Sequence, residues 1–111
     1  MKTYEQILCE VEDHILTITI NRPERHNAYT EFMRDEMIDA LNDAYQDDDI
    51  RVIIFTGNPD GKNYCAGLDL SAGDSTVDFS EEKPLEHRDG GGMLALKLYE
   101  SNKPVIAAIN G

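Results

Sequence analysis

The stretch Tyr64-Cys65-Ala66-Gly67-Leu68-Asp69-Leu70 is the sequence that the rest of this chain is organised to present. It follows the apolar run Val52-Ile53-Ile54-Phe55 and a loop rich in Gly, Asn and Pro. The run predicts a buried strand, so we expect the stretch at the mouth of a sheet, where loops often carry function. The small Ala66-Gly67 pair lets main chain approach a ligand, and the Leu68 amide N–H can point outward at a developing oxyanion. The stretch therefore predicts a site built from backbone, which needs no side-chain nucleophile.

Length and charge limit the classes of protein to which the chain can belong. At 111 residues it suits one small domain, and ten basic against 22 acidic residues give a net charge of −12. That charge argues against non-specific binding to nucleic acid or to an anionic membrane. An anionic ligand would need local basic residues, and Arg22, Arg25 and Lys62 lie in the loops nearest the stretch. Each of the three fits equally well as a solvated charge.

The reactive and metal-binding residue types show no organised pattern. Cys9 and Cys65 are far apart in sequence, without a metal-ligand spacing, which favours reduced thiols in a cytoplasmic protein. His14, His26 and His87 are isolated, and we expect them at the surface or in turns. The N-terminal residues contain no apolar signal segment, and no apolar run is long enough to span a bilayer. The sequence therefore predicts no metal site, no secretion and no membrane span.

Hydrophobic periodicity predicts two strands, a helix and a third strand in the first half of the chain. Apolar residues alternate over 7–11 and 16–20, with Asp13-His14 as the turn of an antiparallel hairpin. From Thr30, a possible N-cap, the spacing changes to three and four and predicts an amphipathic helix to about Tyr45. Its expected core residues are Met33, Met37, Ala40, Leu41 and Ala44. Residues 52–55 are apolar on both faces, which favours a strand of a parallel sheet covered on both sides.

The second half of the chain contains a polar loop, a helix and a strand. Residues 71–83 are small, polar and acidic, so they predict a loop that borders a ligand pocket. Gly90-Gly91-Gly92-Met93-Leu94-Ala95 matches a dinucleotide fingerprint formally, but no strand precedes it, so a helix entry or close packing point is the better interpretation. Residues 93–99 form a broad apolar helical face that ends near Ser101. Pro104 then opens a last buried strand over residues 105–109.

Four blocks of sequence, in this order, resemble the crotonase superfamily, the enoyl-CoA hydratases and isomerases. They are Ile18-Thr19-Ile20-Asn21-Arg22-Pro23-Glu24-Arg25-His26-Asn27-Ala28, Arg51-Val52-Ile53-Ile54-Phe55-Thr56-Gly57, Cys65-Ala66-Gly67-Leu68-Asp69-Leu70 and Lys103-Pro104-Val105-Ile106-Ala107-Ala108-Ile109-Asn110-Gly111. The resemblance begins near Gln6 and covers the N-terminal part of such an enzyme. It implies an α/β fold, an incomplete crotonase-like (ClpP/crotonase) spiral of ββα units, with residues 1–111 as a single partial domain.

The resemblance also implies roles for individual residues. In the family, a thioester enolate or related oxyanion is stabilised between two backbone N–H groups, and Leu68 would supply the first of them. Ala66 would offer backbone to the adenine of coenzyme A, and Gly67 would allow close approach. Among the basic residues in the loops nearest the motif, Arg25 is the one that we expect to contact the coenzyme. Asp69 and Leu70 match the end of the motif, where Asp69 is expected to fix the turn or cap the following helix rather than to act as a base.

By this resemblance the chain is an enoyl-CoA hydratase (a lyase) or isomerase that acts on acyl-CoA, with no permanently bound cofactor and a possible trimeric or hexameric assembly. The family's second N–H donor and its two hydratase glutamates lie beyond the position of Asn110-Gly111. We therefore expect the isolated chain to be inactive. The alternative is a non-catalytic assembly or binding module that pairs with a complementary subunit, because the apolar residues 105–109 would leave a strand edge in need of a partner.

Overall fold

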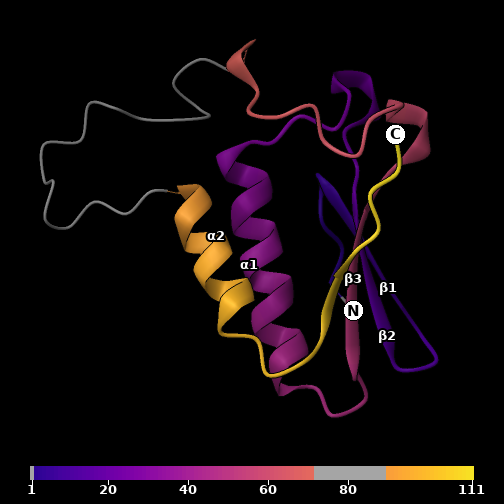
Figure 1. Cartoon of the computed structure of the whole chain (residues 1–111), viewed down its shortest axis with the longest axis vertical. Coiled ribbons are helices and arrows are strands. Elements are labelled where there is room, and N and C mark those ends of the chain that lie inside the picture. The colour runs from indigo at the N-terminus through magenta and orange to yellow at the C-terminus, as the bar shows by residue number, and fades with distance from the viewer. Residues whose placement is uncertain (1, 72–89) are drawn as a thin grey trace, which may run out of the picture.

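The computed structural model describes residues 2–71 and 90–111, which form a four-stranded sheet and two helices (Figure 1). In chain order the elements are β1 (Ile7–Glu12), β2 (Ile15–Ile20), α1 (Glu31–Gln46), β3 (Val52–Gly57), α2 (Gly90–Tyr99) and β4 (Val105–Ala107). Two short 3₁₀ turns, η1 (Pro23–Arg25) and η2 (Pro59–Gly61), follow β2 and β3. Apart from Ser71, the expected polar loop at 71–83 lies outside the described residues.

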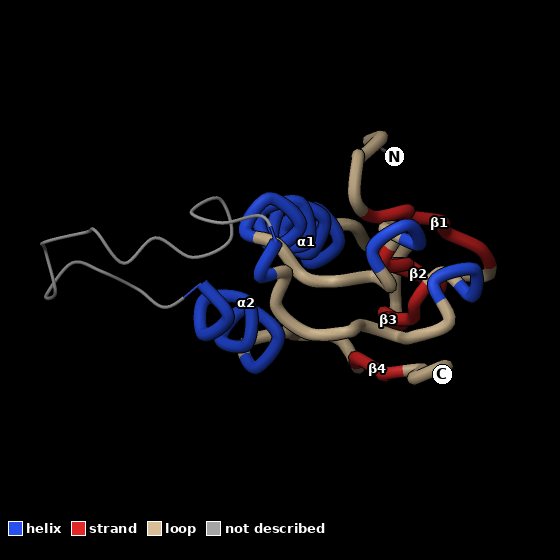
Figure 2. The backbone as a smooth tube through the Cα atoms, turned by 90° about the horizontal axis from the view of Figure 1, so that it is seen from above, coloured by secondary structure: helices blue, strands red, loops and turns tan. Residues whose placement is uncertain are grey.

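The strands lie in the order β1-β2-β3-β4, so neighbours in sequence are neighbours in the sheet. β1 and β2 form the expected antiparallel hairpin, while β2 with β3 and β3 with β4 are parallel. Both helices lie on one side of the sheet, as Figure 2 shows. The expectation that β3 is covered on both sides is therefore wrong: Ile53 and Phe55 are buried, whereas Val52 and Ile54 on the other face are only half-buried.

Most of the buried apolar side chains of the hairpin come from β2. Asp13 and His14 have φ angles of 53° and 67°, so both turn residues are in the left-handed region, which Asp and His tolerate better than most residues. On β2 the inward residues are Leu16, Ile18 and Ile20, all buried as the alternation predicts. On β1 only Ile7 is buried, and the alternation there overestimates burial because β1 is an edge strand.

Helix α1 forms where the sequence predicts and is fixed at both ends. The Thr30 Oγ1 accepts a hydrogen bond from the Met33 N–H at 3.0 Å, and the five expected apolar residues are all buried. Glu36 is also buried, and its carboxylate accepts hydrogen bonds from the N–H groups of Glu5 and Gln6, each at 2.7 Å. At the other end, Lys103 Nζ donates to the carbonyls of Ala44, in the last turn of the helix, and of Asp47, its C-cap. Helix α1 therefore forms hydrogen bonds with the segment before β1 and with the segment before β4.

The C-terminal elements are less buried than the sequence predicts. α2 begins at Gly90 and ends at Tyr99, as expected, yet none of its residues is fully buried. β4 is three residues long and lies at the edge of the sheet, so the expectation of a buried strand over 105–109 is wrong. Within the described part of the chain, no helix is long and apolar enough to cross a membrane.

Candidate functional site

The loop that contains the Cys65–Leu70 motif lies at the carboxyl ends of β2 and β3, beside η1 and η2 (Figure 1). Gly57 lets this loop return over the end of β3, because a Cβ on Gly57 would lie 2.6 Å from the Tyr64 carbonyl oxygen. Any side chain there would displace Tyr64 and the motif that follows it. The position of the motif over the end of β3 therefore depends on the absence of a side chain at Gly57.

Asn27 joins three segments below the motif. Its side chain is fully buried, its Oδ1 accepts from the Arg22 N–H at 3.0 Å, and its Nδ2 donates to the carbonyls of Asn58 and Asn63 at 3.0 and 2.7 Å. A Cβ on Gly61 would lie 2.6 Å from that Nδ2, so η2 packs directly on the amide. Asn27 belongs to one of the sequence blocks, but a buried amide of this kind has no periodicity by which the sequence alone could have identified it.

The Leu68 amide is left outside the hydrogen bonding that holds the loop. Leu68 forms an isolated parallel bridge with Tyr29, in which the Tyr29 N–H donates to the Gly67 carbonyl at 2.8 Å and the Asp69 N–H donates to the Tyr29 carbonyl at 2.9 Å. Since successive peptide groups of an extended segment point to opposite sides, the Leu68 N–H points away from Tyr29. Among residues 2–71 and 90–111, no acceptor pairs with it. The bridge thus fixes the position of a donor without using it.

The residues before Leu68 are small and open to solvent. Gly67 has a φ of 100°, a conformation that an L side chain rarely adopts, and a Cβ built on it would meet nothing within 4 Å. Ala66 is exposed, and its N–H donates to the His26 carbonyl at 3.2 Å. A ligand can therefore approach this backbone without steric obstruction from the described residues.

Asp69 is held in a buried ion pair. Its Oδ2 lies 2.9 Å from Arg22 Nη1, and its Oδ1 accepts from the Ser71 hydroxyl and N–H at 2.6 and 2.9 Å. The hydrogen bonds from Ser71, followed by that from Arg22, lower the pKa of Asp69 to about 2. The resulting stabilisation is present above the ordinary pKa of 3.8 and is lost as the pH falls through about 2. A carboxylate with so low a pKa is a poor general base at neutral pH, and its contacts fix the turn.

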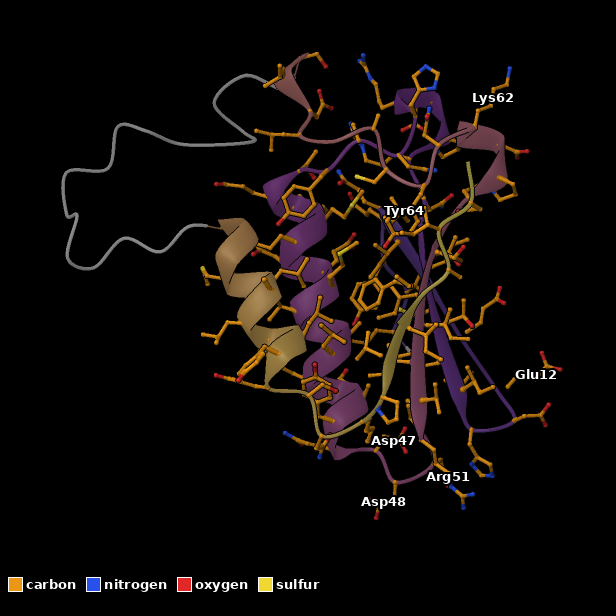
Figure 3. All side chains as sticks on the ribbon, in the orientation of Figure 1. Glu12, Asp47, Asp48, Arg51, Lys62 and Tyr64 are labelled. Atoms are coloured by element: carbon orange, nitrogen blue, oxygen red, sulfur yellow. The ribbon has the colours of Figure 1, made fainter. Side chains whose placement is uncertain are left out.

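The three basic residues near the motif differ in availability. Arg22 also donates to the Ala28 carbonyl at 2.9 Å and is largely buried, so it is committed to the loop and is a poor candidate for a phosphate contact. Arg25 and Lys62 are exposed, one on η1 and the other directly after η2. The two turns are in contact, with His26 Nδ1 at 3.1 Å from the Gly61 carbonyl oxygen. Figure 3 shows Lys62 projecting from the outer edge of these loops.

An apolar cavity of about 250 Å³ lies below the motif, between the sheet and the two helices. Tyr64 and Cys65 close it at the motif end, and Figure 3 shows Tyr64 within the body of the molecule, below Lys62. The other lining residues come from β2, the segment before α1, both helices, β3 and β4: Ile20, Tyr29, Met37, Leu94, Leu98, Phe55, Val105, Ile106 and Ala107. Burial raises the pKa of the Tyr64 hydroxyl, so this side chain is neutral at physiological pH.

The remaining candidate residues do not form a second centre. His14 and His26 lie in turns with positive φ, as expected for turn histidines, while His87 lies outside the described residues. Cys9 and Cys65 are free thiols. Asp47, Asp48 and Asp49 follow one another, exposed, at the end of α1, and Figure 3 shows Asp47 and Asp48 at the opposite end of the molecule from Tyr64 and Lys62. No group within the described residues has the composition of a metal site.

Asn110 continues the sheet beyond β4 with its side chain. Its Oδ1 accepts from the Gly57 N–H at 3.1 Å, and its Nδ2 donates to the Gly57 carbonyl at 2.7 Å. The Asn110-Gly111 dipeptide is thereby held beside Lys62, because a Cβ on Gly111 would lie 2.6 Å from the Lys62 carbonyl oxygen. The sequence block that contains Asn110 gave no indication of this role.

Comparison with known proteins places this geometry in a family. The family model described as enoyl-CoA hydratase/isomerase matches residues 10–111. The enoyl-CoA hydratase ACTT3 of Alternaria alternata is 38% identical over 99 residues, which are 89% of this chain and 32% of that protein. The 1,2-epoxyphenylacetyl-CoA isomerase of Escherichia coli K12 is 36% identical over 110 residues, 96% of this chain and 40% of that protein.

The fold comparison agrees. The crystal structure of an enoyl-CoA hydratase/isomerase from Xanthobacter autotrophicus matches with a TM-score of 0.79 and 30% identity, over 98% of this chain and 40% of that one. The chain therefore spans about one third to two fifths of the length of these relatives. It has an incomplete crotonase-like α/β fold and belongs to the enoyl-CoA hydratase/isomerase family.

Proposed function

We propose that this chain supplies the N-terminal part of an acyl-CoA site, in which the Leu68 backbone N–H donates a hydrogen bond to the thioester oxygen. The observation that carries the proposal is the Tyr29–Leu68 bridge, which holds this N–H in place and leaves it without a partner among the described residues. A donor that is already positioned needs little reorganisation as negative charge develops on the oxygen. One such donor is typically worth roughly 3 kcal/mol of the activation barrier in a complete site.

The coenzyme A part of the ligand would follow the exposed backbone and the free basic residues. Ala66 and Gly67 present accessible main chain to the adenine, and Leu70, which is 82% exposed, offers an apolar contact beside it. Arg25 is the candidate phosphate ligand, with Lys62 beside it on the neighbouring turn. These two charges provide local attraction for an anion in a chain whose net charge is −12.

The chain contributes binding and charge stabilisation in this proposal, but no proton transfer. Asp69 is the carboxylate next to the donor, and its low pKa and its pairing with Arg22 make it unsuited to accept a proton. Acid and base groups, and with them the choice between hydration and isomerisation, would come from outside residues 1–111. We accordingly expect the isolated chain not to hydrate crotonyl-CoA.

Amide NMR of the ¹⁵N-labelled chain tests the assignment of the donor. Crotonyl-CoA is compared with S-butyl-CoA, a thioether that lacks the thioester carbonyl oxygen. Both should perturb the Arg25 and Lys62 amides, whereas only the thioester should move the Leu68 amide proton downfield, because only it offers an acceptor at the position of the thioester oxygen.

Two variants provide the matched control for that experiment. Leu68→Ala retains the N–H and should retain the difference in affinity between the two ligands, while Leu68→Pro removes the donor and should abolish that difference. A Leu68 amide that responds equally to both ligands would contradict the proposal. Hydration of crotonyl-CoA by the isolated chain would contradict the assignment of proton transfer to groups outside it.

A further inference from the structure

His26 presents one ring nitrogen to solvent, and a hydrogen bond on the other nitrogen fixes its tautomer. The residue follows η1, and its Nδ1 lies 3.1 Å from the Gly61 carbonyl oxygen. Because a carbonyl oxygen only accepts hydrogen bonds, Nδ1 carries the proton, and Nε2 of the neutral ring keeps a lone pair. His26 is exposed, and its Nε2 makes no hydrogen bond with any residue in the ranges 2–71 and 90–111. The ring therefore offers a hydrogen-bond acceptor at the surface.

The turns that hold this acceptor are anchored on both sides of the ring. His26 has a φ of 53°, and its N–H donates to the Pro23 carbonyl at 3.2 Å. Gly61 packs on the fully buried side chain of Asn27, because a Cβ on Gly61 would lie 2.6 Å from the Asn27 Nδ2. An acceptor whose position is set before a ligand arrives loses little conformational entropy on binding.

A second acceptor lies on the neighbouring segment. The Ala66 N–H donates to the His26 carbonyl at 3.2 Å, so the two residues are adjacent, and Ala66 is exposed. The Ala66 carbonyl oxygen accepts no hydrogen bond from any other residue that the structure describes. Two neighbouring acceptors suit a nitrogen that carries two hydrogens. The exocyclic amino group of adenine is such a group, whereas guanine has a carbonyl oxygen at the same ring position.

We propose that His26 selects adenine as the base of the ligand: its Nε2 accepts one hydrogen of the exocyclic amino group, and the Ala66 carbonyl accepts the other. The inference rests on the proposed function, which places coenzyme A along this backbone with Arg25 and Lys62 near its phosphates. It adds a side chain that recognises the base, because phosphate contacts alone do not distinguish one base from another.

Two nucleotides that differ in one group test the inference. Adenosine 3′,5′-bisphosphate represents the nucleotide end of coenzyme A, and purine riboside 3′,5′-bisphosphate is the same molecule without the amino group. NMR titration of the ¹⁵N-labelled chain at about pH 8, where a histidine ring is neutral, gives the two dissociation constants. We expect the unmodified chain to bind the adenine nucleotide about tenfold more tightly, which is typical for two hydrogen bonds at an exposed site.

Three substitutions separate the ring nitrogen from the other contacts. His26→Asn keeps a donor for the Gly61 carbonyl and tolerates positive φ, but it has no group at the position of Nε2, so the preference for adenine should fall to about threefold or less. His26→Gln can place an amide oxygen near that position and should recover part of the preference. Arg25→Met is the charge control, which should weaken both nucleotides equally and leave their ratio unchanged.

Imidazole ¹⁵N chemical shifts of the unmodified chain provide a measurement that does not depend on the folding of a variant. Only the adenine nucleotide should shift the Nε2 resonance of His26, because only it donates to that nitrogen. Equal affinity for the two nucleotides, an equal shift of Nε2 with both, or a preference that His26→Asn leaves intact would overturn the inference without affecting the Leu68 donor. Binding of neither nucleotide would overturn both the inference and the proposed position of coenzyme A.

Discussion

Of the two helices, the more polar one, α1, is the more deeply buried, and the more apolar one, α2, is the more exposed. α1 contains charged residues throughout and buries six side chains, including Glu36. α2 is more apolar than α1 and buries none fully. Apolar composition alone therefore does not decide whether a helix is covered, because burial also requires an element that packs against its apolar side.

The position of each helix in the sheet explains the difference. α1 connects β2 to β3, which lie in the middle of the sheet, so its apolar face packs on a continuous layer of strands. α2 precedes β4 at the edge and contacts α1, where the Tyr45 hydroxyl donates to the Lys97 carbonyl at 2.7 Å. Of the large apolar side chains of α2, Leu94 and Leu98 are the two that pack, partly buried, against the core.

Truncation of a core residue in α1 should produce the largest effect. Leu41→Ala should lower the free energy of unfolding by about 3 kcal/mol, because Leu41 is fully buried and leaves a cavity. Urea denaturation followed by circular dichroism measures it. A loss no larger than that from a truncation in α2 would mean that α1 does not hold the core.

The N-terminal cap of α1 should contribute the next largest effect. Thr30→Ala removes the acceptor of the Met33 N–H and should cost about 1 kcal/mol in the same urea experiment. Thr30→Ser keeps the hydroxyl and serves as the control, for which we expect nearly the stability of the unmodified chain. Equal losses in the two variants would show that the side-chain hydrogen bond is not the cause.

The contact between Lys103 and the end of α1 should contribute less to the free energy of unfolding. Lys103, in the segment before β4, donates to the carbonyls at the end of α1, so Lys103→Met should cost about 0.5 kcal/mol through lost capping of the negative helix end. The loss should decrease in high salt. Arg51→Met, which removes an equal charge from an exposed position, is the control and should change the free energy of unfolding less.

The smallest effect is expected on the exposed side of α2. Leu96→Ser should change the free energy of unfolding of the isolated chain by less than about 0.5 kcal/mol, because no described residue buries Leu96. Urea denaturation provides the measurement. A loss comparable to that from Leu41→Ala would show that α2 is already covered in solution and would remove the contrast between the helices.

The candidate site was predictable where it depends on local sequence. The Ala66-Gly67 pair and the strand before it indicate an accessible backbone near Leu68, and the structure shows that backbone at the carboxyl ends of the strands. The ion pair between Arg22 and Asp69 was not predictable, because the two residues are 47 positions apart and either could have been a solvated charge. The hydrogen bonds from Asn27 to the carbonyls of Asn58 and Asn63 were not predictable either, because these residues are 31 and 36 positions away in the sequence.

The hairpin, the extent and cap of α1, the end of α2 and the family were all predictable from the residues alone, because they follow from spacing and short motifs that act within a few residues. The pattern did not reveal that the apolar residues of β1, α2 and β4 are largely exposed, that Arg22 is committed to Asp69, or that β4 is an edge strand; these facts came from the three-dimensional arrangement. Burial and pairing depend on which segments meet across the sheet, and a one-dimensional pattern records the polarity of a residue but not its neighbours.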